Sequence, residues 1–211
     1  MMGVMGTYRQ LLNTEGPRYQ EHLLRLDSES RYARFSAITS DEVIGRYCQN
    51  IDWRTSKIIG FFHDGVLRGA AEIRYDLRPL PDQAELAFSV EKDFQNSRVG
   101  TSLMVRALLT LRNRAVSKAH IVCLLGNRRM QKLALRYRAN FKAHLGDVFL
   151  TIDVPYGDIS SLLAELVDGY LGWMNAGIDM VLGPKERSPL FERSPPPTVP
   201  LTTTTQQQLP R

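Results

Sequence analysis

The stretch that most constrains the fold runs from residue 84 to residue 115 and predicts a strand, a polar loop and an amphipathic helix. Residues 84–90 (AELAFSV) alternate small or polar side chains with larger apolar ones, as a strand does. After the loop, apolar residues recur at helical spacing: Val99, Leu103, Met104, Ala107, Leu108, Leu111 and Ala115. The first turn of a helix carries unpaired backbone N–H groups and a partial positive charge. A strand that leads into such a turn predicts an anion site, usually for phosphate.

The same stretch resembles the acyl-CoA-binding motif of the GNAT N-acetyltransferase superfamily. That motif begins with Gln or Arg, has Gly at its fourth position and Gly or Ala at its sixth, and lies between a strand and a helix. Its six positions are filled here by Gln95, Asn96, Ser97, Arg98, Val99 and Gly100. Arg98 departs from the pattern, because glycine there lets the backbone approach a pyrophosphate. The guanidinium either pairs with phosphate or crowds the site, and the sequence leaves both open.

The resemblance implies acetyl-CoA as co-substrate, bound without a metal. It implies main-chain contacts from Phe88, Ser89 and Val90, because the free edge of this strand pairs with the pantetheine amides. It implies further contacts from the loop and first helical turn: Gln95, Asn96, Ser97, Arg98, Val99, Gly100, Thr101 and Ser102. Asn127, after a later strand, is a further candidate for the pantetheine arm. An asparagine there also caps a helix whatever the function.

Glu85 is the candidate general base. An alkylammonium must lose a proton before it attacks a thioester, and a carboxylate accepts that proton directly or through water. Glu85 shares a strand face with Ala87 and Ser89, which leaves room for a substrate. A solvent-facing strand glutamate is the alternative. Glu72 is the reserve carboxylate, although its alternation with arginines favours a surface ion-pair ladder.

Tyr137 is the candidate general acid, because many members of the superfamily protonate the leaving thiolate with a tyrosine on the helix after the fifth strand. The spacing to Phe141 is one residue short of the usual pattern and would put Arg136 in that place. Tyr137 also fits the apolar face of its helix, so a core tyrosine is equally open. Cys123 is expected to be a core thiol, because nothing near it in sequence would activate it.

The order of elements predicts an α/β (α+β) fold with a mixed, mostly antiparallel central sheet flanked by helices. Helices are expected at 17–26 and 41–49, the second capped by Thr39, with irregular chain at 32–36. The predicted domains are 1–157 for the acyl-CoA-binding acetyltransferase domain, 158–183 for an added C-terminal amphipathic helix, and 184–211 for a disordered Pro-, Thr- and Gln-rich tail.

The added helix carries only acidic charges among its apolar residues. This pattern favours packing on the domain or on a second copy in a homodimer. A membrane-surface helix would have Lys or Arg on its polar face. No apolar run is long enough to span a bilayer, and the two cysteines lack paired spacing. A cytoplasmic protein is therefore expected, without a disulfide framework or a metal site.

The net charge of +5 suits an anionic partner. Basic residues gather along the third and fourth helices, where they would hold cofactor phosphates, bind nucleic acid or, for most of them, face solvent. Aromatic residues do not interleave with them, which disfavours nucleic acid.

The sequence therefore predicts an N-acetyltransferase that moves the acetyl group of acetyl-CoA to a primary amine of a small molecule or a protein, by direct attack with general-base assistance. The first alternative is an acyl-CoA-binding regulatory module without turnover, which Arg98 and the unsettled acid both allow. The weaker alternative is a nucleic-acid-binding protein.

Overall fold

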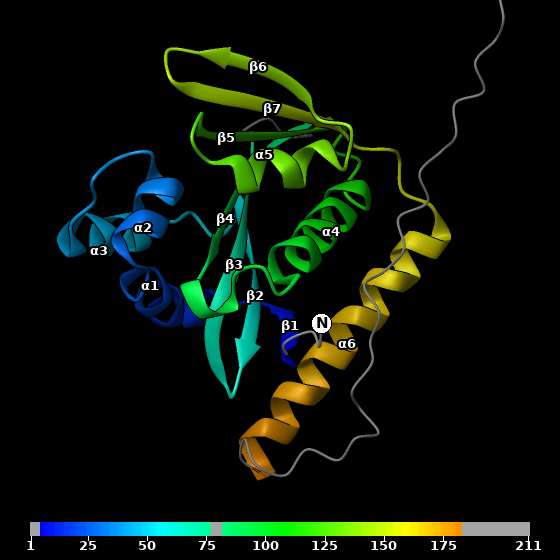
Figure 1. The fold of residues 1–211 in the computed structure, drawn as a ribbon. Coiled ribbons are helices and arrows are strands. Elements are labelled where there is room, and N and C mark those ends of the chain that lie inside the picture. Colours follow the sequence, from blue (N-terminus) through cyan, green and yellow to red (C-terminus); the bar gives the residue numbers. More distant parts are fainter. Residues whose placement is uncertain (1–4, 77–81, 183–211) are drawn as a thin grey trace, which may run out of the picture.

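The computed structural model of the protein describes residues 5–76 and 82–182, which form one seven-stranded sheet with helices on both faces (Figure 1). The strands are β1 (Thr7–Gln10), β2 (Ser56–His63), β3 (Val66–Tyr75), β4 (Gln83–Val90), β5 (Lys118–Leu124), β6 (Asn140–His144) and β7 (Asp147–Asp153). Their order across the sheet is β1-β2-β3-β4-β5-β7-β6. Only β4 and β5 are parallel neighbours, which confirms the predicted mixed, mostly antiparallel sheet.

The helices divide between the two faces of the sheet. One face carries α1 (Gly16–Leu24), α2 (Ser28–Phe35) and α3 (Asp41–Gln49), and the other carries α4 (Val99–Arg112) (Figure 1). Two short 3-10 turns, η1 (Asn13–Glu15) and η2 (Lys92–Phe94), precede α1 and α4. Each face has its own core, the larger one under α4. The helix α4 is the crossover that a parallel pair such as β4 and β5 requires.

The last two helices lie beside this frame. The helix α5 (Arg128–Leu135) follows β5, and the predicted C-terminal helix is present as α6 (Ile159–Leu182), which lies along α4 and β1 (Figure 1). None of the helices in the described ranges combines the length and apolarity that crossing a bilayer requires. The tail predicted at 184–211 lies outside the described residues.

Two expectations for the N-terminal helices are wrong. Residues 32–36, expected to be irregular, fall largely within α2, because Asp27 caps that helix by accepting a hydrogen bond from the Ser30 amide at 2.7 Å. The N-cap of α3 is Ser40 and not Thr39, although the helix begins where it was predicted.

The parallel pair separates after three residues. Gln83, Ala84 and Glu85 pair with β5, after which β4 continues along β3 and β5 continues along β7. The later half of β4 therefore has no strand on its β5 side. Apart from the Val90 carbonyl, which accepts a hydrogen bond from the Gln95 side chain, its backbone groups on that edge have no strand partner and suit a ligand that pairs as a strand would.

Candidate active site

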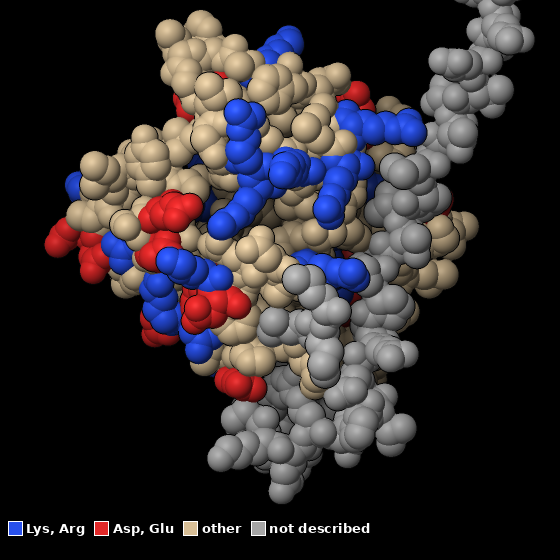
Figure 2. Space-filling model, viewed as in Figure 1, with Lys and Arg blue, Asp and Glu red and all other residues tan. Residues whose placement is uncertain are grey.

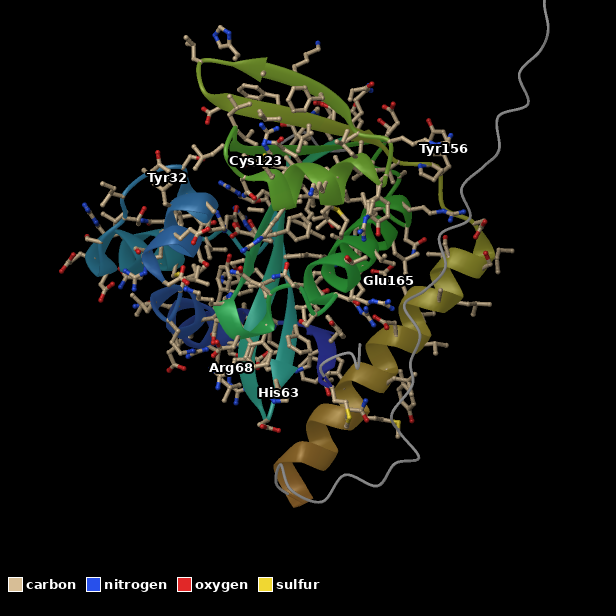
Figure 3. All side chains as sticks on the ribbon, viewed as in Figure 1. Tyr32, His63, Arg68, Cys123, Tyr156 and Glu165 are labelled. Atoms are coloured by element: carbon tan, nitrogen blue, oxygen red, sulfur yellow. The ribbon has the colours of Figure 1, made fainter. Side chains whose placement is uncertain are left out.

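A pocket lies where β4 and β5 separate. The two strands line it with small or apolar residues, and the start of α5 and the helix α2 complete it. The lining residues are Leu86, Ala87 and Phe88 of β4, Ile121, Val122 and Cys123 of β5, Asn127 and Met130 at the start of α5, and Ala33 and Arg34 of α2. Cys123, labelled in Figure 3, is 2% exposed. Burial raises the pKa of its thiol to about 11, so it stays protonated at neutral pH. The expectation of a core thiol is confirmed.

The loop between β4 and α4 has the backbone shape that glycine would favour. Arg98 is the N-cap of α4 with φ 69° and ψ 0°, and Asn96 has φ 59°, so both lie in the left-handed region. A non-glycine residue in that region costs about 1 kcal/mol or more. The turn expected of the motif is therefore formed at Arg98 without the glycine that usually forms it.

The first turn of α4 presents unpaired amides beside this loop. Ser102 donates the first backbone hydrogen bond of the helix, to the Arg98 carbonyl at 2.9 Å. The amides of Val99, Gly100 and Thr101 precede it and have no intrahelical acceptor. Together with the helix dipole they form an anion site. Ser102 differs from these three, because its amide is already bonded.

Gln95 joins the loop to both sides of the pocket. Its side-chain nitrogen donates to the Val90 carbonyl at 2.9 Å and to the Ser30 hydroxyl of α2 at 3.0 Å. Its side-chain oxygen accepts a hydrogen bond from Arg129 of α5. The Ser97 hydroxyl bonds back within the loop. These contacts hold the loop in one shape between α2 and α5.

Basic residues gather near the loop, over α5, as Figure 2 shows. The exposed ones on and just after that helix are Arg128, Arg129, Lys132, Arg136 and Arg138. Three arginines of the α4 region that were expected to face solvent or a polyanion instead form ion pairs with the C-terminal segment: Arg106 with Asp168, Arg112 with Asp158 and Arg114 with Glu165. The positive charge available to an anion thus comes mainly from α5.

Glu85 directly precedes the three residues of β4 that line the pocket, and it is not itself among the described lining residues. It is the last residue of β4 that pairs with β5, opposite His120. Its side chain is 47% exposed and accepts a hydrogen bond from Arg74 at 3.2 Å. Ala87, two residues on and on the same strand face, lines the pocket.

Glu72 does not lie at the surface, contrary to what its alternation with arginines favoured, although it does form an ion pair with one of them, Arg74, at 3.4 Å. It is 1% exposed and pairs with Ala87 in the register of β3 and β4. Its carboxylate accepts hydrogen bonds from Tyr19 at 2.8 Å, from Tyr47 at 2.5 Å and from Arg34 at 2.7 Å. The alternation misled because α1, α2 and α3 cover this face of the strand and bring the partners.

The other two candidates lie on the α5 side. Tyr137 lies in the turn after α5, half-buried, and packs against the core beneath α4; burial raises its pKa. It is not among the described residues that line the pocket. Asn127 does line the pocket, and its side chain also caps α5 by accepting a hydrogen bond from the Met130 amide at 3.1 Å.

A chain of hydrogen bonds that sequence patterns gave no sign of lies under the end of β4. The Ser89 hydroxyl is 2.9 Å from His22 Nε2, and His22 Nδ1 is 3.1 Å from Glu91 Oε1. Glu91 also accepts from Arg25 and Arg68, at 2.9 and 2.8 Å. The connectivity is that of a nucleophile triad. His22 is fully buried and Ser89 is 6% exposed, so the chain fastens α1 to β4.

The described part of the chain brings no three His, Cys, Asp or Glu side chains together as a metal-binding group. The residues that it does bring together are the loop at 95–98, the free amides of α4, the open edge of β4 and the pocket beside them. Neither Glu85 nor Tyr137 is among the described residues that line this pocket.

Neither a protein-family profile nor a curated protein sequence matches the chain. Solved structures do. The GNAT domain of S. lividans PAT superposes with a TM-score of 0.61 at 20% identity, over 70% of this chain and 90% of that one. The ribosomal-protein-S18-alanine N-acetyltransferase of Escherichia coli gives 0.56 at 16%, over 74% and 97%. The PaiA N-acetyltransferase of Thermoplasma acidophilum, solved in complex with coenzyme A, gives 0.53 at 16%, over 70% and 98%. The chain therefore has the GNAT fold.

Proposed function

We propose that the protein is an N-acetyltransferase that moves the acetyl group of acetyl-CoA to a primary amine. The observation that carries the proposal is the arrangement of three unpaired amides at the start of α4 beside a pocket where β4 and β5 separate. Such amides suit a diphosphate, and an open strand edge suits the amides of a pantetheine arm. The solved structure of a GNAT-fold protein with coenzyme A supports the same ligand class.

In the proposed complex the pyrophosphate lies on the amides of Val99, Gly100 and Thr101. The side chains of the loop, Gln95, Asn96, Ser97 and Arg98, surround it, and the basic residues of α5 add positive charge. The pantetheine arm follows the main chain of Phe88, Ser89 and Val90 and passes Asn127. The thioester then lies in the pocket, between Phe88 and Cys123.

The chemistry we propose is a direct transfer. The amine nitrogen attacks the thioester carbonyl carbon, the carbon–sulfur bond breaks, and the thiolate of coenzyme A leaves. Glu85 accepts the proton of the incoming ammonium, directly or through water. Tyr137 is the proposed proton donor to the thiolate. The protonated, buried thiol of Cys123 supports the absence of a covalent enzyme intermediate, because the thiolate is the nucleophilic form.

The proposal is tested by release of free thiol from acetyl-CoA with a panel of small amines and lysine peptides. Glu85→Gln should lower kcat by roughly 100-fold, the lower end of what a general base contributes, and leave the Kd of coenzyme A unchanged in calorimetry. Asp153→Asn is the matched control, because Asp153 is a strand carboxylate on β7 that is 70% exposed, against 47% for Glu85, and it is not among the described residues that line the pocket. A kcat that stays the same in Glu85→Gln would remove Glu85 from the mechanism.

The second candidate is an acyl-CoA-binding module without turnover. It is favoured by Arg98 at a glycine position and by the placement of Tyr137 behind the pocket. It predicts saturable binding of acetyl-CoA and no amine-dependent release of thiol with any member of the panel. The acceptor, small molecule or protein, is identified by the same panel.

A further inference from the structure

The helix α6 turns its polar side toward the domain. Arg106 of α4 donates to both carboxylate oxygens of Asp168, at 2.8 and 2.6 Å. Glu165 accepts from Arg114 at 2.9 Å and from Asn113 at 2.7 Å, and Figure 3 places it between α6 and α4. Glu165 and Asp168 of this helix are thus paired inside the molecule.

The polar side of α6 also packs closely against the backbone of β1. Gly172 faces the main chain of Tyr8, and a Cβ added to that glycine would lie 2.3 Å from the Tyr8 carbonyl oxygen. At the next residue, the guanidinium of Arg9 stacks on the Trp173 ring, 4.6 Å from its centroid, so Trp173 lies at the border between this side of the helix and its other face. A helix held by a bidentate ion pair and a glycine contact cannot rotate without losing both. The orientation of its other face is therefore set.

That other face is apolar and exposed. Its large side chains are Ile159, Leu162, Leu163, Leu166, Val167, Tyr170, Trp173 and Met174, with exposed fractions from 37% to 78%. Residues 159, 163, 166, 170 and 173 follow one another at intervals of four, three, four and three. This is the spacing of a seam between two paired helices. No Lys or Arg occurs within α6, so the face has no basic rim.

The area of this face matches what one side of a dimer buries. With about 200 Å² for a fully exposed large side chain, the eight residues expose roughly 900 Å². The largest apolar patch on a typical monomer is about 300–600 Å². A protein–protein interface of standard size buries about 800 Å² on each partner. The face is therefore larger than a monomer usually leaves uncovered and large enough for a stable contact.

We propose that α6 is a homodimer interface, covered by α6 of a second copy of this chain. A second copy brings an equal apolar area, and the carboxylates of Glu165 and Asp168 are paired with arginines of their own domain, which suits a two-fold contact between identical faces. A lipid surface is disfavoured because the helix lacks basic residues. Residues 183–211 are a poorer match, since they hold only five large apolar side chains among Pro, Thr and Gln: Leu190, Phe191, Val199, Leu201 and Leu209. The inference is independent of the proposed enzymatic activity.

The test is sedimentation velocity of the full chain from 1 to 100 µM. The wild type should sediment as a dimer, and the double variant Leu166→Glu, Tyr170→Glu should raise the dimer Kd by at least about 30-fold, the effect of losing a central interface residue. Ile38→Glu is the matched control, because Ile38 is 99% exposed and lies away from α6. This control should keep the dimer. Circular dichroism at a temperature well below unfolding should give all three proteins the same helix content, because each substituted side chain is exposed. The double variant should have a lower Tm than the other two, because it loses the stabilisation that the dimer provides.

Three outcomes would overturn the proposal. The first is a wild-type chain that stays monomeric at 100 µM. The second is a dimer whose Kd is the same in the double variant, which would place the contact elsewhere. The third is a monomeric wild type that co-sediments with neutral phosphatidylcholine vesicles while the double variant does not, which would assign the face to lipid.

Discussion

At Arg98, the strain of the backbone and the contact that the side chain would make with a ligand can be tested separately. Its left-handed backbone is strained, so Arg98→Gly should raise the free energy of unfolding by about 1 kcal/mol. A guanidinium that pairs with phosphate contributes about 1.5 kcal/mol or more, so the same variant should weaken coenzyme A binding by roughly 10-fold. Urea unfolding measures the first effect and calorimetry the second.

Arg98→Ala is the control for this pair of effects. It removes the guanidinium and keeps the strain, so it should weaken coenzyme A binding by the same factor and leave stability close to the wild-type value. Tighter binding in Arg98→Gly would show that the arginine crowds the phosphate, which is the alternative that the sequence leaves open.

Residues 84–102 were predictable because their signals are local. Alternation marks β4, the polar loop ends it, and apolar spacing from Val99 marks α4. The chain of Ser89, His22 and Glu91 was not predictable. His22 precedes Ser89 by 67 residues and Glu91 by 69 residues in the sequence. No local pattern relates a buried histidine to a strand end so far along the chain.

At the scale of elements, Glu72 joins three helices to one strand. Tyr19, Arg34 and Tyr47 come from α1, α2 and α3, and their hydrogen bonds converge on this carboxylate of β3. Glu72→Gln removes the charge that balances the buried Arg34, whose side chain is 5% exposed. We expect the free energy of unfolding to fall by about 3 kcal/mol. Urea unfolding measures the loss.

Glu85→Gln is the comparison for that variant. Glu85 is exposed, and its substitution should change stability by no more than about 0.5 kcal/mol. The two variants should therefore differ in their defect: Glu72→Gln should lose stability, and Glu85→Gln should lose turnover. Equal stability of the two variants would contradict the role given to Glu72.

The separation of β4 from β5 shows that sequence patterns predict single strands but not how far two strands pair. Both strands were predicted close to their observed bounds, because each is a short apolar or alternating run. Their pairing over only three residues depends on β3 and β7, which hold the two strands in different directions. The same limit applies to α6, whose helical spacing was readable but whose polar side, not its apolar side, packs on the domain.

At the scale of the molecule, Glu91 joins parts that are far apart in the chain. It accepts hydrogen bonds from Arg25, which follows α1, and from Arg68 of β3, and it contacts His22 of α1. Glu91 itself stands at the start of the segment that leads to α4. The helix α1 and the strand β3 are therefore fastened through one carboxylate to the loop that we propose binds the cofactor.

This arrangement predicts loss of stability in acid. Burial acts to raise the pKa of Glu91, but hydrogen bonds from His22, Arg68 and Arg25 outweigh it and lower the pKa from 4.5 to about 2. A carboxylate with a lowered folded-state pKa stabilises the fold above pH 4.5 and loses that contribution as the pH falls toward 2. The contribution is about 3 kcal/mol. His22 acts in the same direction, because burial lowers its pKa and the unfolded chain takes up a proton below pH 6.5.

Urea unfolding between pH 7 and pH 3 measures this dependence, and Glu91→Gln is the matched variant. The wild type should lose stability as the pH falls below 6.5, most steeply below 4.5. The variant should be less stable by about 3 kcal/mol at pH 7, and the difference should shrink toward pH 3, because protonation removes the same charge from the wild type. Parallel curves for the two proteins would show that Glu91 titrates alike in the folded and unfolded chain. The fastening of α1 and β3 to the cofactor loop would then rest on contacts other than this carboxylate.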